Sequence, residues 1–351
     1  MQETLKLPFY AKIALIFISL FGLIFALQIA RDILIPIAMA TIFAVLLNPI
    51  VNYLESKKIN KFFAISLTVF LGLLIVSGLL FFLISQASSF SDALPILKKK
   101  FNESSSDLIS WIAGKTNFKE AKIQSWMLDA QKDQIKQFKI GEKISSVGNV
   151  LITTVLLPVY MVMILYYKPL LLEFFRRLFR DRDFIAVEEV LLNTKKIIQS
   201  YVVGLFIEFI IIAILNSLGL LMMGIRYAFL LGVIGALLNL IPYLGAMIAA
   251  TIYMLIAFIT MPPIFVVYVL IMYGVIQVID NNFLIPRIVA SRVQINALAS
   301  IISVIIGGAI WGIPGMFLSI PLIAIVKVVC DHVDSLNAWG FLLGDKFTDK
   351  A

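Results

Sequence analysis

The chain has 351 residues, of which 61% are hydrophobic and only 14% are charged, and its mean hydropathy is +1.01. Because soluble globular proteins are only about half apolar, this composition excludes the soluble classes and predicts an integral membrane protein. The formal charge of +8 suggests nucleic acid, but most Lys and Arg residues fall in short segments between apolar runs, where charge sets membrane orientation, so no nucleic-acid partner is expected. One cysteine, Cys330, and one histidine, His332, argue against a disulfide framework and a transition-metal site. We expect neither a metal nor a cofactor.

Six apolar runs are long enough to cross a bilayer. A spanning helix needs about 20 apolar residues, because the hydrocarbon core is about 30 Å thick and a helix rises about 1.5 Å per residue. The first run is too long for a signal-peptide core and lacks a clear cleavage site, so we expect a retained anchor. The six predicted spans are residues 9–30, 33–54, 62–84, 149–167, 200–223 and 264–279.

Two further runs, residues 228–259 and 298–329, are too long for one untilted crossing, at about 48 Å each. Each contains a proline close to a glycine, Pro242 with Gly245 and Pro314 with Gly315. Since proline removes a helix hydrogen bond and clashes with the preceding turn, we expect a break in each run and a re-entrant hairpin around it. The predicted fold is all-α: a polytopic membrane protein with about six full spans, two broken or re-entrant helix pairs and a helical extracytoplasmic segment.

The connecting segments predict the orientation. Basic residues in the connector 55–61 and in the stretch 168–200 favour the cytoplasm for both, and with them for the N- and C-termini. The long segment between the third and fourth spans then lies outside, and apolar residues at helical spacing predict two amphipathic helices there, with a packing or assembly role favoured over ligand binding. The predicted parts are the N-terminal spans (1–84), the extracytoplasmic segment (85–148), the fourth span (149–168), a cytoplasmic basic segment (169–199), a transport core with broken helices (200–330) and a cytoplasmic tail (331–351).

Polar residues inside the apolar runs are the candidates for function, because an ionisable group in hydrocarbon is costly unless it is paired or hydrated. Glu208 is flanked by apolar residues on both sides. It is explained either by an interhelical hydrogen bond or protonated carboxyl, or by a proton or cation site. Asn216, Asn239 and Gln277 are weaker candidates, since amides in membrane helices often only join helices.

A polar cluster, Asp280, Asn281 and Asn282, stands in the stretch QVIDNNFLIPRIV at residues 277–289. One interpretation is that the predicted helix ends here and that these side chains cap the next one. The other is a substrate path, because Pro286 imposes a new backbone direction and Arg287 can pair with Asp280 beside the second broken run.

Four blocks of sequence resemble the autoinducer-2 exporter family of bacterial membrane permeases. They are PIAMATIFAVLLNPIV (36–51), GVIGALLNLIPYLGAMIAA (232–250), QVIDNNFLIPRIV (277–289) and IIGGAIWGIPGMFLSIPLIAIVKVV (305–329). The positions that match the family's pattern are Pro36, Asn48, Pro49, Gly204, Asn239, Pro242, Gly245, Gln277, Asp280, Asn281, Pro286, Arg287, Gly312 and Gly315. One departure stands out: where the family often has His and Pro after PRIV, this chain has Gln294, Ile295 and Asn296.

The resemblance implies a multi-pass protein of the bacterial cytoplasmic (inner) membrane that forms a homo-oligomer, with a pentamer among the expected states. It also implies export of a small polar signalling molecule used in quorum sensing, whereas some members are associated with sodium or lithium exchange for protons. The function we expect is therefore export by alternating access, with segment 200–330 moving against the first four spans. Asn239, Gln277, Asp280 and Asn281 would bind the solute, and Glu208 would be the titratable group.

The sequence leaves three alternatives to the exporter to compare with it. A sodium(lithium)/proton antiporter predicts cation flux without an organic solute. A non-transporting membrane scaffold would use the extracytoplasmic helices and the basic segment to bind partners. An enzyme is not expected, because a single His and a single Cys near the tail leave no nucleophile and base pair, and no nucleotide-binding glycine loop is visible.

Overall fold

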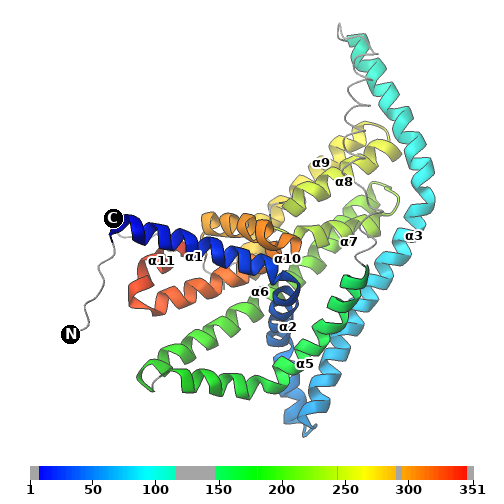
Figure 1. The fold of residues 1–351 in the computed structure, drawn as a ribbon. Coiled ribbons are helices and arrows are strands. Elements are labelled where there is room, and N and C mark those ends of the chain that lie inside the picture. The colour runs from blue at the N-terminus through cyan, green and yellow to red at the C-terminus, as the bar shows by residue number, and fades with distance from the viewer. Residues whose placement is uncertain (1–7, 116–146, 180, 243, 290–294, 346–351) are drawn as a thin grey trace. The chain divides into compact units, whose positions relative to one another are not determined.

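A computed structural model describes residues 8–115, 147–179, 181–242, 244–289 and 295–345. Helices dominate these residues, and the only β pairing among them is an isolated bridge between Ile295 and Gly344. The elements, labelled where space allows in Figure 1, are α1 (Phe9–Ile29), α2 (Arg31–Ser56), α3 (Lys61–Lys115), α5 (Val147–Leu178), α6 (Asp181–Met222), α7 (Ala228–Asn239), α8 (Leu244–Thr260), α9 (Ile264–Ile279), the π-helix η2 (Asp280–Val289), α10 (Ala297–His332), the 3-10 helix η4 (Asp334–Leu336) and α11 (Asn337–Leu343).

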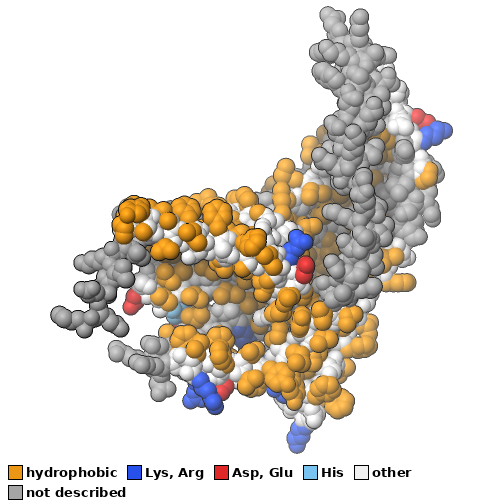
Figure 2. Space-filling model, viewed as in Figure 1, with side chains coloured by type: hydrophobic (Ala, Val, Ile, Leu, Met, Phe, Trp, Pro, Cys, Tyr) orange, Lys and Arg blue, Asp and Glu red, His pale blue; other side chains and the backbone are white. Residues whose placement is uncertain are grey.

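The all-α membrane fold is confirmed. Seven helices of the described chain are long and apolar enough to cross a membrane, and apart from α10 each overlaps one of the six predicted spans. Many of their large apolar side chains are exposed, including Phe9 (78%), Phe21 (68%) and Phe25 (64%) on α1. Figure 2 shows the side chains of α1 as an apolar band. In water such a surface would be unfavourable, whereas lipid tails cover it at no cost.

The chain forms two compact units. Unit 1 comprises Met1–Ser66, Leu156–Gln199 and Val293–Ala351, and unit 2 comprises Leu67–Val155 and Ser200–Arg292. The predicted transport core, residues 200–330, is therefore shared: its part up to residue 292 belongs to unit 2, and the remainder belongs to unit 1.

The third span is part of a much longer helix than predicted. Helix α3 has 55 residues and continues past residue 84 to Lys115, so the span and the first expected amphipathic helix are one element. Pro95 lies inside it without ending it. The second amphipathic helix, expected around residues 123–138, lies outside the described residues. The basic segment 169–199 is also helical, because α5 ends only at Leu178 and α6 begins at Asp181.

The first broken run forms the helix pair α7 and α8, as predicted. Pro242 lies in the link between the two helices, and α8 contacts α7 along its length (Figure 1). A Cβ atom on Gly245 would lie 1.6 Å from the backbone oxygen of Leu238, so only glycine permits this return of the chain. On α7, Gly235 leaves room for the hydroxyl of Tyr253, which donates to the backbone oxygen of Leu231 at 3.0 Å.

The second run is broken too, within the stretch WGIPGMF (311–317) in which the break was expected around Pro314 and Gly315. The non-helical residue in α10 is Gly312, with φ 63° and ψ −143°, a conformation that is essentially restricted to glycine. Pro314 and Gly315 follow in the first turn of the second half, where proline is tolerated because its missing N–H would be unpaired anyway. A Cβ on Gly315 would lie 2.0 Å from the backbone oxygen of Gly307, which shows that the two halves fold back on each other.

The chain does not leave the helix at Asp280, which corrects the capping interpretation. Helix α9 passes directly into η2, whose ten residues have π-helical hydrogen bonding. Pro286 lies inside η2, so the helix break expected there is absent. The π-helix η2 itself ends at Val289. The side-chain amide of Asn282 donates to the backbone oxygen of Val278 at 2.8 Å, within the helix, and caps nothing. Short π-helical segments recur at functional sites, because they rotate the following side chains relative to the helix before them.

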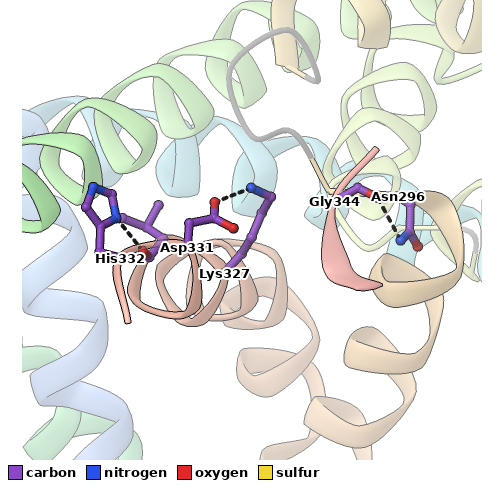
Figure 3. A network of polar contacts seen from close by, with 6 residues as sticks. Asn296, Lys327, Asp331, His332 and Gly344 are labelled. Carbon is purple, nitrogen blue, oxygen red and sulfur yellow. Dashed lines mark hydrogen bonds and ion pairs between the residues drawn. The ribbon is translucent and has the colours of Figure 1, made fainter. Parts of the chain in front are cut away.

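Polar contacts tie together the C-terminal part of unit 1 (Figure 3). The oxygen of the Asn296 side chain accepts from the N–H of Ala299 and caps α10, while its amide donates to the backbone oxygens of Leu342 and Gly344, at 2.7 and 3.0 Å. Asn296 is part of the VQINAL stretch in which this chain departs from the resembled family. It therefore has a structural role here, since it joins the start of α10 to the end of α11.

Candidate functional site

A cluster of polar side chains lies within unit 2. It consists of Glu208 from α6, Asn239 from the end of α7, Tyr273 and Gln277 from α9, and Asp280 from the start of η2. Glu208 is 4% exposed and Asp280 is 1% exposed, so both carboxyl groups are removed from solvent. Four of these five residues were predicted as site residues from the sequence.

Helix geometry brings these side chains together. Tyr273, Gln277 and Asp280 are separated by four and three residues, which places them on one face of the continuous helix formed by α9 and η2. Asn239 is the last residue of α7, directly before the link that contains Pro242. On α6, Glu208 shares its buried face with Ile212, which packs with Ala236 of α7 and Ile276 of α9. The hydrophobic contacts thus hold three helices around the polar groups.

Asn239 occupies the centre of the cluster. Its amide nitrogen donates to Oδ2 of Asp280 at 2.9 Å and to Oε1 of Glu208 at 3.2 Å. Its oxygen accepts from the amide nitrogen of Gln277 at 3.4 Å. One amide therefore bridges two carboxyl groups from different helices.

Tyr273 is a member of the cluster that the sequence analysis missed. Its hydroxyl accepts from Gln277 at 3.0 Å and donates to the backbone oxygen of Ala246 at 2.9 Å. The second bond reaches the first turn of α8, so it ties both helices of the broken pair to the cluster. The spacing from Tyr273 to Gln277 and Asp280 is the signal that could have identified it.

The cluster is electrostatically incomplete. Two carboxyl groups converge on one neutral amide, and Oδ1 of Asp280 is buried without a hydrogen-bond partner. Two negative charges held this close in an apolar unit need a proton or a cation to offset them. Within the described ranges, no group of three or more His, Cys, Asp or Glu side chains is arranged to hold a metal ion.

Helix α6 also carries a buried amide. Asn216 is 0% exposed, and neither atom of its amide has a hydrogen-bond partner. It follows Glu208 by eight residues, or about two helical turns and about 12 Å. Buried amides are almost always paired, so an unpaired one marks a place where water or a polar solute would fit.

The family model for AI-2E family transporters matches residues 13–335, nearly the whole chain. The chain belongs to the AI-2E transporter family. Its relatives include YhhT of Escherichia coli (strain K12), which is 24% identical over 344 residues, covering 93% of this chain and 92% of the relative. YueF of Bacillus subtilis (strain 168) is 25% identical over 313 residues, covering 83% and 82%. The AI-2 transport protein TqsA of Escherichia coli (strain K12) is 23% identical over 353 residues, covering 95% and 96%.

Membership of the AI-2E family confirms the recognition made from the sequence blocks, and it makes this chain a multi-pass membrane protein of a bacterial family of transporters. The polar cluster of unit 2 contains Asn239, Gln277 and Asp280, which are among the positions that match the family's blocks. The cluster therefore lies where both the fold and the resemblance direct attention.

Three predicted site residues of this AI-2E family member lie outside the cluster. Asn281 and Asn282 are exposed, because they follow Asp280 around the helix and turn away from its buried face. The guanidinium of Arg287 lies 5.8 Å from the ring centre of Phe283, in cation–π geometry. Its pairing with Asp280 stays a prediction.

Proposed function

We propose that this chain is a secondary transporter that exports a small polar signalling molecule resembling autoinducer-2. Family membership supports transport, and the printed name of TqsA, an AI-2 transport protein, supports the solute class. The bridging of Glu208 and Asp280 by Asn239 is the observation that carries the proposal. Such a cluster, held at the break between two short helices, is the arrangement in which transporters bind solutes within the membrane.

Each member of the cluster has a role in this proposal. Asn239 and Gln277 offer amide donors and acceptors to a hydroxylated solute, and Asp280 offers the carboxylate oxygen that has no partner. Glu208 is the titratable group that gains or loses a proton as the solute leaves. Gly245 allows the backbone of the broken pair to approach closely. Solute entry breaks the hydrogen bonds that Asn239 donates to the two carboxyl groups. Binding of solute and retention of the proton on Glu208 therefore become linked.

Alternating access is the mechanism that fits these roles. Residues 200–330, which contain both broken helices, would move against a scaffold formed by the first four spans. The cluster would then open to one side of the membrane at a time. It would not open toward lipid, because charged groups are costly in hydrocarbon.

Flux in proteoliposomes tests this function. Glu208→Gln and Asp280→Asn keep the shape of each side chain but remove the charge, and both should abolish most of the solute efflux. Glu173→Gln is the matched control, because Glu173 lies on α5, outside the cluster, and pairs with Arg177 on the same helix. Unchanged efflux in both cluster variants would refute the roles assigned to the two carboxyl groups.

The second candidate is a sodium(lithium)/proton antiporter. The observation that favours it is the pair of carboxyl groups around one amide, since oxygen ligands of this kind suit Na⁺ or Li⁺ and exchange readily with protons. An antiporter would move ²²Na⁺ down an imposed pH gradient in vesicles that contain no organic solute. The exporter would show no such flux.

Orientation and assembly complete the proposal. The basic segments favour the cytoplasm for both termini, and the resemblance to exporters favours a homo-oligomer, with a pentamer as the specific expectation. With Cys330 replaced, labelling of single cysteines introduced at the exposed positions Lys58 and Trp339 from each side of the membrane tests the orientation. Mass photometry of the protein in nanodiscs tests the number of subunits.

A further inference from the structure

We propose that unit 1 contains a binding site for a phosphate group, formed by Asn48 of α2, Lys168 of α5 and Lys195 of α6. The three residues belong to one compact unit and lie apart in the sequence. This site is separate from the polar cluster of unit 2 and does not depend on the proposed export function.

Asn48 provides the first part of the site. It is 5% exposed, and its side-chain oxygen accepts from Nζ of Lys168 at 3.0 Å. Its amide nitrogen is buried and has no hydrogen-bond partner. The acceptor of this amide is thus occupied while the donor is free, so the group that completes it must supply a hydrogen-bond acceptor.

Lysine side chains provide the charge. The charged groups that act on Lys168 are the ammonium groups of Lys195 and Lys61 and the carboxylate of Glu55. Lys168 and Lys195 are both half-buried, and neither forms an ion pair with a carboxylate in the part of the chain that the structure describes. Three positive groups against one negative group leave this region with a net positive charge, and a bound anion would offset it.

The position of Lys168 indicates which anion fits. Lys168 directly follows the apolar run predicted at residues 149–167, and Lys61, the first residue of the candidate span Lys61–Gln86, marks the level where that span meets the lipid headgroups. Nearby, Nζ of Lys61 donates to the backbone oxygen of Tyr166 at 2.9 Å and lies 5.2 Å from the centre of its ring. Lysine and tyrosine together are typical of the headgroup level. A basic pocket between helices at this level binds lipid phosphate, and inorganic phosphate presents the same oxygens.

Native mass spectrometry of the full-length protein tests the site. The protein is exchanged into mixtures of phosphatidylglycerol, which is anionic, and phosphatidylcholine, and the retained lipids are counted for each variant. Lys168→Gln and Lys195→Gln should each weaken retention of phosphatidylglycerol by about fivefold, the effect expected for one lysine near a membrane surface. Lys196→Gln is the matched control: Lys196 is the next residue on the same helix and is exposed, so retention should stay within about twofold.

A second arm identifies the source of the phosphate. Inorganic phosphate is added to protein in neutral detergent without lipid, and binding is measured by calorimetry. Binding of phosphatidylglycerol alone assigns the site to a lipid headgroup, whereas binding of inorganic phosphate with the same dependence on Lys168 and Lys195 assigns it to a soluble anion. Equal effects of Lys195→Gln and Lys196→Gln in both arms would overturn the proposal, because they would indicate diffuse attraction only. Lys168→Arg keeps the charge and should retain binding, which separates loss of the site from loss of the fold.

Discussion

The amide nitrogen of Asn239 donates to the carboxylate of Asp280 at 2.9 Å, across the gap between the end of α7 and the start of η2. The same nitrogen reaches Glu208 on α6, so one neutral side chain holds two acidic ones together. Without this donor, both carboxyl groups would be buried with fewer hydrogen-bond partners.

Replacement of Asn239 by leucine should therefore reduce transport strongly. Hydrogen bonds to charged groups contribute about 1.5–3 kcal/mol each, so the loss of the bonds from Asn239 should lower flux in proteoliposomes by about tenfold to a hundredfold. The control is Asn282→Ala, because the amide of Asn282 is exposed and bonds only within its own helix. Similar losses in the two variants would show that Asn239 has no special place in the site.

Two buried tyrosines distinguish a role in the site from a role in packing. Tyr273→Phe removes the hydroxyl that joins Gln277 to Ala246 and should reduce flux, because Gln277 is no longer held in position. Tyr253→Phe removes a bond to the backbone oxygen of Leu231, outside the cluster, and should lower the midpoint of thermal unfolding without changing flux. The loss of one hydrogen bond corresponds to about 1 kcal/mol of stability. If flux fell equally in both, the distinction between the two tyrosines would fail.

The close return of α8 onto α7 should be sensitive to a single methyl group. Gly245→Ala places Cβ 1.6 Å from the backbone oxygen of Leu238, and backbone cannot move as easily as a side chain. Overpacking of this kind costs about 1–3 kcal/mol, so thermal unfolding in detergent should occur at a lower temperature. Gly274→Ala is the control, because its Cβ would have no heavy atom within 4 Å. An unfolding midpoint for Gly245→Ala equal to that of Gly274→Ala would contradict the observed helix pair.

The bend in α10 should depend on Gly312 more than on Pro314. Gly312→Ala forces a side chain into backbone angles of φ 63° and ψ −143°, at a cost of about 1–3 kcal/mol. Pro314→Ala should cost less, because Pro314 occupies the first turn of the second half, where its missing N–H is not needed. Comparison of the two midpoints of thermal unfolding measures the difference. A larger effect of Pro314→Ala would show that the bend depends on Pro314 rather than on Gly312.

The contacts of Asn296 predict a local effect on the tail (Figure 3). Asn296→Ala removes both the cap of α10 and the bonds to Leu342 and Gly344, so hydrogen exchange of the α11 amides should accelerate. Loss of a helix cap of this type costs about 0.5–2 kcal/mol. Asn60→Ala is the control: Asn60 accepts from the N–H of Phe62 at the start of α3, so its loss should leave exchange in α11 unchanged. Protection of α11 that is unaffected by Asn296→Ala would refute the joining role.

The sequence alone determined the class of fold and the length of most spans. Hydrophobic run length decides whether a helix can cross a bilayer, because the thickness of the hydrocarbon core is nearly constant. It also indicated that the run around Pro242 and Gly245 is broken, since two half-length helices are the simplest way to fit it into the membrane. Local rules of this kind need no knowledge of the neighbouring helices.

The sequence was less informative about where individual helices end. Lys115 ends α3 far beyond the predicted boundary, because the polar residues after residue 84 are compatible with helix and Pro95 does not end it. In the second run, proline drew attention to position 314, although proline in a first helical turn breaks nothing and the positive φ falls at Gly312. The chemical identity of a residue does not reveal its position within a turn.

Only the tertiary structure decided which polar groups meet. In the sequence, Asn239 lies 31 residues after Glu208 and 41 residues before Asp280, and no periodicity relates the three residues. Asn281 and Asn282 are adjacent to Asp280 in the sequence but are turned outward by the helix, whereas Tyr273, seven residues earlier, faces the same side as Asp280. Side-chain partners across helices depend on how the helices pack and rotate against each other, and that packing is set by many apolar contacts together rather than by any short stretch of the chain.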